Sequence, residues 1–108
     1  MEAFCLKFVL VIACYILHNS SLDKFYTGFT QESIEERLEK HDTGLYGKSY
    51  TANLSGKWEL FLLIECYSAS QALKIEKHIK AMKSKKYIQN LKIYPEIIEK
   101  LKDRYKST

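Results

Sequence analysis

Residues 13–29, with the sequence ACYILHNSSLDKFYTGF, decide the fold of this chain. They begin inside an apolar run over residues 3–17 that is rich in Val, Ile, Phe, Tyr and Cys, which predicts a central strand buried on both faces. Residues 18–23 form a polar turn, and the β-forming residues 24–29 predict a second, short strand. We therefore expect the two strands to pair as an antiparallel hairpin.

After the hairpin, the pattern predicts four helices and one more strand. These elements are a helix over 31–41, a strand over 58–67 and helices over 69–83, 85–91 and 95–105. Thr30 can cap the first of these helices, and Pro95 suits the first turn of the last. Ser68 and Gln71 have the spacing of a capping box at the start of the second helix.

The resulting order, ββα-β-αα with a further C-terminal helix, is typical of an α+β fold. We expect a small, mostly antiparallel three-stranded sheet flanked by helices. The length of 108 residues suits one domain, with a core over about 11–91 and a C-terminal helical extension over 92–108. Three of the four glycines fall in the long connection over 42–57, and loops of that length are more often functional than idle.

Composition excludes several classes of protein. With 46% hydrophobic residues, the chain is too apolar to be disordered. The N-terminal apolar run is shorter than the roughly 20 residues of a membrane-spanning helix, and Glu2 argues against a secretory signal. Cys5, Cys14 and Cys66 are odd in number and lack C-x-x-C spacing, which favours reduced, mostly buried thiols. We therefore expect a cytoplasmic protein that does not bind a membrane.

The basic residues gather in the last third of the chain. Residues 1–73 have a formal charge of −3 and residues 74–108 a formal charge of +7. Such an asymmetry indicates contact with a polyanion, such as nucleic acid or an acidic membrane surface. A solvated, lysine-rich helix explains the charge equally well.

Two polar residues continue an apolar stripe on the helix predicted over residues 31–41. Ile34 and Leu38 define its buried face, and Arg37 and His41 complete the same face. An unpaired buried charge is costly, and arginine suits bidentate contact with phosphate, so both are candidate functional residues. The structural alternative is an arginine that extends to solvent at the rim and a histidine that stabilises the helix C-terminus.

Glu76 is the only acidic residue within residues 66–95. It lies at the edge of the stripe predicted to be buried, which consists of Ala72, Ile75, Ile79 and Met82. A lone carboxylate that faces the sheet suits one divalent cation, whereas the simpler explanation is an i,i+4 ion pair with Lys80. The outer arc of the same helix carries Lys74, Lys77 and Lys80.

The hairpin contributes two tyrosines and a glycine. Tyr15 is expected at the end of the first strand, and Tyr26 lies in the second. Buried tyrosines are mostly core residues that satisfy one hydrogen bond. Gly28 leaves the interior of a strand without a side chain, which often marks a bulge or the close approach of a ligand backbone.

Together these segments resemble the GIY-YIG nuclease superfamily, in particular its small stand-alone bacterial members, which look like the N-terminal catalytic domain of the excinuclease component that carries this fold. The resemblance covers about residues 11–91 and is carried by ACY at 13–15, YTG at 26–28, Arg37 to His41, and Glu76. The GIY triplet keeps only its tyrosine, because Ala13 and Cys14 stand in place of Gly and Ile.

The resemblance implies a metal-dependent endonuclease that hydrolyses DNA phosphodiester bonds with one Mg²⁺ or Mn²⁺. It implies that Tyr15 and Tyr26 share the roles of base and orienting group, and that Arg37 steadies the phosphate. By the same resemblance His41 assists proton transfer and Glu76 binds the metal. The residues expected to contact substrate are Gly28, Lys74, Lys77, Lys80 and Asn90.

Two other functions are compatible with the same residues. One is a catalytically weak nucleic-acid-binding module on the same scaffold, and the other is a structural domain whose tyrosines and arginine are core and rim residues. The expected partner is DNA, with branched or damaged DNA and roles in repair or recombination among the candidates. Little base specificity is expected, because no segment resembles a recognition helix.

Overall fold

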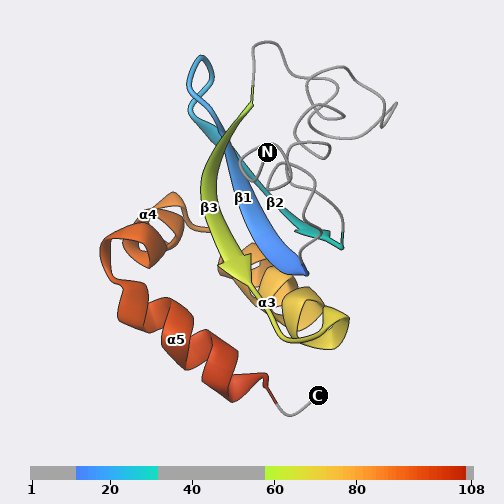
Figure 1. Ribbon diagram of the computed structural model, residues 1–108. Helices are drawn as coiled ribbons and strands as arrows, with labels where there is room; N and C mark the ends of the chain where they lie inside the picture. The colour runs from blue at the N-terminus through green and yellow to red at the C-terminus, as the bar shows by residue number, and fades with distance from the viewer. Residues whose placement is uncertain (1–11, 32–57, 107–108) are drawn as a thin grey trace, which may run out of the picture.

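A computed structural model describes residues 12–31 and 58–106 of the chain. Its three strands, β1 (Ala13–Asn19), β2 (Lys24–Thr30) and β3 (Glu59–Glu65), form one sheet in the order β2-β1-β3 (Figure 1). Both neighbours of β1 pair with it in the antiparallel sense. Three helices follow, α3 (Ala69–Met82), α4 (Lys85–Ile93) and α5 (Pro95–Arg104). The predicted α+β class and the predicted hairpin are confirmed.

The central strand β1 is longer at its C-terminal end than predicted. His18 and Asn19, expected in the turn, pair with Phe25 and Lys24 in the ladder. The rings of His18 and Phe25 lie 4.6 Å apart, and this contact favours the extended conformation. Tyr15 consequently lies in the middle of β1 rather than at its end.

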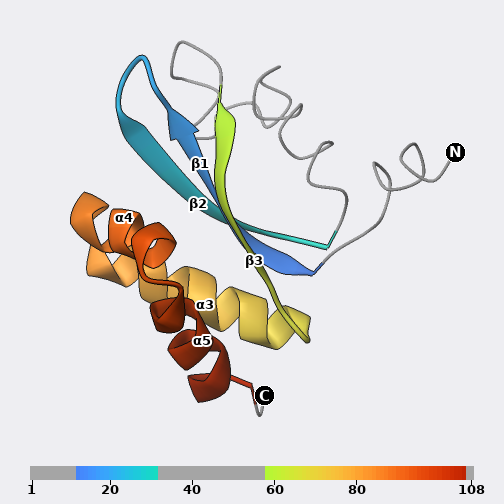
Figure 2. The same ribbon diagram turned by 60° about the vertical axis from the view of Figure 1, so that its left-hand side comes forward.

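All three described helices lie on one side of the sheet (Figure 2). Their apolar side chains pack against the side chains of β1 and β3 that point to this side; the buried members of this cluster are Cys14, Ile16, Ile64, Ile75, Ile79, Ile88, Leu91 and Leu101. A second, smaller cluster on the opposite side contains Tyr15, Leu17 and Trp58. Side chains alternate along a strand, so neighbouring residues of β1 belong to different clusters.

Helix α3 begins as predicted but ends differently. The Ser68 side chain accepts the Gln71 backbone N–H at 3.1 Å, as a helix cap requires. The Gln71 side chain does not complete a capping box. It is fully buried, accepts the Tyr67 N–H at 2.7 Å and donates to the Lys102 carbonyl at 2.8 Å, which ties α3 to α5. Met82, predicted to be buried, is 45% exposed because the α3 stripe in contact with the sheet stops at Ile79.

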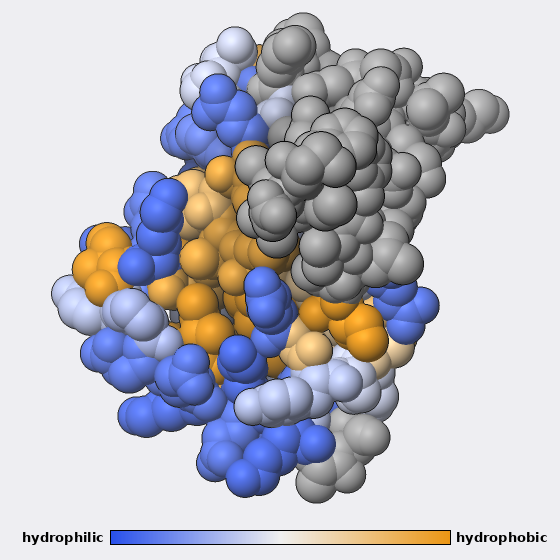
Figure 3. Space-filling model, in the orientation of Figure 1, coloured by the Kyte–Doolittle hydropathy of each residue, from blue (hydrophilic) through white to orange (hydrophobic). Residues whose placement is uncertain are grey.

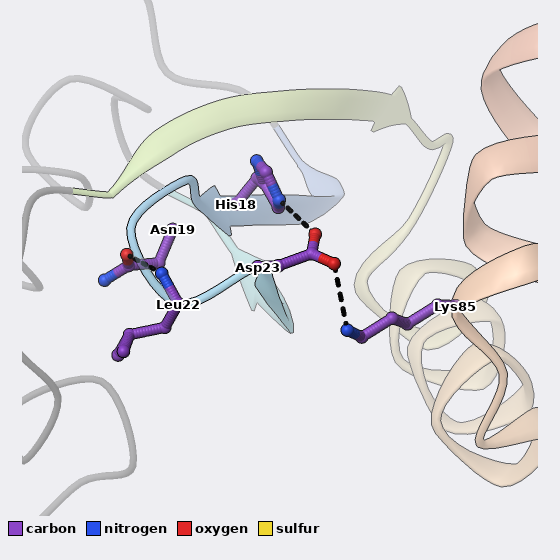
Figure 4. A network of polar contacts seen from close by, with 5 residues as sticks. All are labelled: His18, Asn19, Leu22, Asp23 and Lys85. Carbon is purple, nitrogen blue, oxygen red and sulfur yellow. Dashed lines mark hydrogen bonds and ion pairs between the residues drawn. The ribbon is translucent and has the colours of Figure 1, made fainter.

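The hairpin turn is anchored to the first turn of α4 (Figure 4). Asp23 has a left-handed backbone with φ 52°, and its carboxylate lies 3.0 Å from His18 Nε2 and 3.1 Å from Lys85 Nζ. The Asn19 side chain accepts the Leu22 N–H at 3.1 Å and closes the turn. Asp23 thus joins β1, the turn and α4 in one polar network.

The Asp23 carboxylate makes the stability of the fold depend on pH. The hydrogen bond with His18 and then the Lys85 ammonium lower the pKa of Asp23 from its ordinary value of 3.8. Since the folded-state pKa is depressed, the carboxylate stabilises the fold above about pH 3.8, and this contribution is lost as the pH falls through the folded-state value. Asp23→Asn keeps a residue that tolerates φ > 0 and should lower the free energy of unfolding slightly at pH 5. Urea unfolding at pH 5 and at lower pH checks this.

The matched control is Glu99→Gln, which removes an exposed carboxylate from α5. The difference between wild type and Asp23→Asn should shrink below about pH 3.8, whereas Glu99→Gln should show no such dependence. A difference for Asp23→Asn that persisted at full size well below that pH would mean that its charge is not the cause.

The predicted helix over 31–41 and the connection over 42–57 lie, apart from residue 31, outside the described residues. In the part of the chain that is described, no helix has the length and apolar character needed to cross a membrane. Hydrophilic side chains cover much of the helical side of the molecule in Figure 3, around an apolar area at β3.

Candidate active site

Tyr15 and Gly28 form the closest contact of the candidate site. They face each other across the β1–β2 ladder, and Tyr15 is fully buried. A Cβ atom built on Gly28 would lie 2.6 Å from both Cζ and the hydroxyl oxygen of Tyr15. The Tyr15 phenol therefore crosses directly over Gly28 toward the edge strand β2. The close approach expected at this glycine is made by a side chain of the protein itself.

Tyr26 lies on the same face of the sheet as Tyr15. It pairs with Leu17, two residues along β1, so the two tyrosines are diagonal neighbours whose ring centroids are 6.4 Å apart. Leu17 and Leu63 pack with them on this face. The sheet register alone therefore brings together two phenols that are eleven residues apart in sequence.

Glu76 reaches the same sheet edge from the helical side. Its side chain is only 16% exposed, and Oε2 lies 2.9 Å from Lys80 Nζ, one turn further along α3. The same Lys80 ammonium lies 5.8 Å from the centre of the Tyr26 ring. Lys80 therefore connects the glutamate below the sheet with the tyrosine on its upper face, at the edge formed by β2.

The thiol of Cys14 confirms how close Glu76 lies to the sheet. Burial, and next the negative charge of Glu76, raise the pKa of the Cys14 thiol far above its ordinary value of 9.0. Cys14 therefore stays a neutral thiol that fills the core, as its position in the altered GIY triplet allows. Cys14 and Cys66 are both free cysteines, as predicted.

The other predicted substrate contacts are dispersed. Lys74, two residues from Glu76, lies about 160° around α3 from it, and Lys77 about 100°, because each residue turns the helix by about 100°. Both are exposed. Asn90 is half-buried in α4, and its carbonyl accepts the Tyr94 N–H at 2.8 Å. Of the three lysines, the structure brings only Lys80 to Glu76 and Tyr26.

Arg37 and His41 lie outside the described residues, so their predicted roles stay predictions. Within residues 12–31 and 58–106, no three carboxylate, imidazole or thiol groups gather as a metal-binding cluster. Glu76 is thus the one described carboxylate beside the two tyrosines.

The geometry agrees with a comparison of the sequence with protein-family models. The model of the GIY-YIG catalytic domain matches residues 11–89. The chain belongs to the GIY-YIG family. Neither a search of curated proteins nor a search of solved structures finds a match. The family match confirms the predicted resemblance and ends within α4, so α5 lies beyond it.

GIY-YIG domains are nuclease domains whose members generally use divalent metal ions, and DNA is the substrate class that the family suggests. Two features of this GIY-YIG domain were not foreseen from sequence. One is the contact of Tyr15 with Gly28, and the other is the position of Lys80 between Glu76 and Tyr26. The i,i+4 spacing of Glu76 and Lys80 signalled their ion pair, but no sequence pattern places Tyr26 beside it.

Proposed function

We propose that this GIY-YIG protein is a metal-dependent endonuclease that hydrolyses DNA phosphodiester bonds. The observation that carries the proposal is the meeting of three groups at the β2 edge: Tyr26, the Glu76 carboxylate and the Lys80 ammonium between them. A nuclease needs a base, a cation site and positive charge for the phosphate, and these groups supply all three.

Glu76 has the chemistry of a site for one hard divalent cation. Mg²⁺ keeps several waters in proteins and is held by one or two carboxylates together with phosphate oxygens of the substrate. A single, mostly buried carboxylate that faces a groove fits this description, and no cluster of three ligands is needed. When bound, the cation would stabilise negative charge on the leaving oxygen. Lys80 pairs with the carboxylate in the metal-free protein and would have to give way.

The tyrosines would act on the attacking water. A phenol acts as a base near neutral pH only beside positive charge, and the Lys80 ammonium supplies such charge next to Tyr26. Tyr15, held by the sheet over Gly28, would orient the water or its neighbouring phenol. In this scheme Arg37 would steady the phosphate and His41 would assist proton transfer. The family resemblance supports these last two roles.

We place this activity in the cytoplasm, in DNA repair or recombination. The two free cysteines of the described region support a reducing compartment, because Cys14 and Cys66 are not joined in a disulfide. Branched and damaged DNA are the substrates to compare with intact duplex.

Purified protein should nick supercoiled plasmid with Mg²⁺ or Mn²⁺ and not with EDTA. Tyr26→Phe removes only a hydroxyl group and should lower the cleavage rate about a hundredfold, which is typical of losing one acid–base group. Gel separation of nicked and supercoiled plasmid measures the rate. Tyr94→Phe, at an exposed position between α4 and α5, is the control and should cleave at the wild-type rate.

Binding without cleavage would favour the alternative, a catalytically weak nucleic-acid-binding module. If wild-type protein binds DNA but nicks none of the substrates with either metal ion, the nuclease proposal is wrong. If Tyr26→Phe cleaves as fast as wild type, the tyrosine is not part of the chemistry.

A further inference from the structure

A groove leads away from the candidate site along the other side of β2. It has a volume of about 530 Å³ and lies between β2 and the junction of α3 with α4. Its lining includes Phe25, Tyr26, Ile79, Lys80, Lys83 and Ile88. Tyr26 and Lys80 belong both to this groove and to the candidate site, so a ligand in the groove would be continuous with the reacting phosphate.

Two lysines stand at the walls of the groove and of the shallower hollow next to it. Lys83 lines both, and Lys24 of β2 lines the hollow. In the part of the chain that the structure describes, no acidic group pairs with either ammonium, whereas Lys80 pairs with Glu76 and Lys85 with Asp23. Lys24 and Lys83 therefore offer uncompensated positive charge on opposite walls.

The backbone of Lys83 is an independent sign that its side chain matters. Lys83 is the C-cap of α3 and has a left-handed conformation, with φ 49° and ψ 45°. Glycine is the usual residue there, because a Cβ atom makes this conformation unfavourable. The hydrogen bond that closes this cap joins the Lys83 backbone N–H to the Lys80 carbonyl, and glycine could make it equally well. A lysine is thus kept at a site where it weakens the fold.

We propose that Lys83 and Lys24 bind phosphates of one DNA strand that lies in this groove, next to the phosphate held at Tyr26. An apolar floor that includes Phe25, with lysines at the rim, is typical of a channel that follows a single strand. This assignment rests on the proposed function for its ligand, since it extends the same site by one or two nucleotides.

The test measures binding of a fluorescein-labelled oligodeoxynucleotide, single-stranded and as a duplex, by anisotropy in EDTA at several salt concentrations. Lys83→Gly should bind the single strand roughly fivefold more weakly at 0.1 M salt, and its salt slope should fall by about 0.7. Its melting temperature should equal or exceed that of wild type, because glycine suits the left-handed cap. Lys83→Asn also tolerates this conformation and is the second variant.

Lys24→Gln, on the opposite wall, should weaken binding in the same way. Lys100→Gln is the matched control, because it removes an exposed lysine of α5 that does not line the groove. The proposal is wrong if Lys83→Gly or Lys24→Gln keeps wild-type affinity and salt slope, or if Lys100→Gln loses as much. It is also wrong if only the duplex responds to these substitutions.

Because EDTA removes the metal ion, these measurements do not depend on catalysis. A wild-type protein that never cleaves DNA, but whose affinity falls with Lys83→Gly and Lys24→Gln, would overturn the proposed nuclease function and leave the groove assignment standing. Cleavage with no response of binding to either substitution would do the reverse.

Discussion

Glu76→Gln is expected to lower the rate of metal-dependent DNA cleavage by at least about a hundredfold. Glutamine has the shape of glutamate but lacks the charge that holds a hard cation, and a hundredfold loss corresponds to about 3 kcal/mol of transition-state stabilisation. Glu76 is the one described carboxylate beside the two tyrosines, so within the described region no second acid stands ready to replace it. Plasmid nicking over a range of Mg²⁺ and Mn²⁺ concentrations measures the effect.

The same substitution should leave DNA binding intact or strengthen it. In wild type the Lys80 ammonium lies 2.9 Å from the Glu76 carboxylate, and Glu76→Gln releases that ammonium to contact phosphate. Loss of cleavage with equal or tighter binding in EDTA would separate the metal role from a structural one. Glu99→Gln on α5 is the matched control and should cleave like wild type. Wild-type cleavage by Glu76→Gln would contradict the assignment of Glu76 as the metal ligand.

Gly28→Ala is expected to have the second largest effect. The added methyl group would lie 2.6 Å from Tyr15 Cζ and the Tyr15 hydroxyl oxygen, well inside van der Waals contact, so the buried phenol must move. Overpacking of this kind destabilises a protein by about 1–3 kcal/mol. A displacement of about 1 Å in a positioning group costs about a hundredfold in rate. Urea unfolding and plasmid nicking measure the two effects separately.

A double-mutant cycle shows whether Gly28→Ala acts through Tyr15. Tyr15→Phe removes the hydroxyl group, and adding Gly28→Ala to it should cause little further loss of activity, because the group that was displaced is already absent. Thr27→Ala, at the neighbouring buried position of β2, is the control for general damage to the strand. Effects of Gly28→Ala and Tyr15→Phe that simply add would show that the glycine supports activity by another route.

Local patterns predicted the described elements well and their ends less well. The hairpin, the third strand and the helices α3, α4 and α5 follow from runs of apolar residues and from cap residues such as Ser68 and Pro95. The errors lie where tertiary contacts compete with local preference. His18 stays in β1 because its ring stacks on Phe25, and Gln71 leaves its capping role because its buried amide bridges to α5.

The amino-acid sequence by itself determined the family, the strand and helix order, and the residue types of the site, because periodicity and motif spacing are local properties of the chain. Only the tertiary structure decided which of these residues meet. The antiparallel register sets Tyr15 against Gly28 and Tyr26 beside it, and the packing of α3 along β2 brings Lys80 and Glu76 to the same edge. Register and helix packing result from burial of the whole core, so no single segment encodes them.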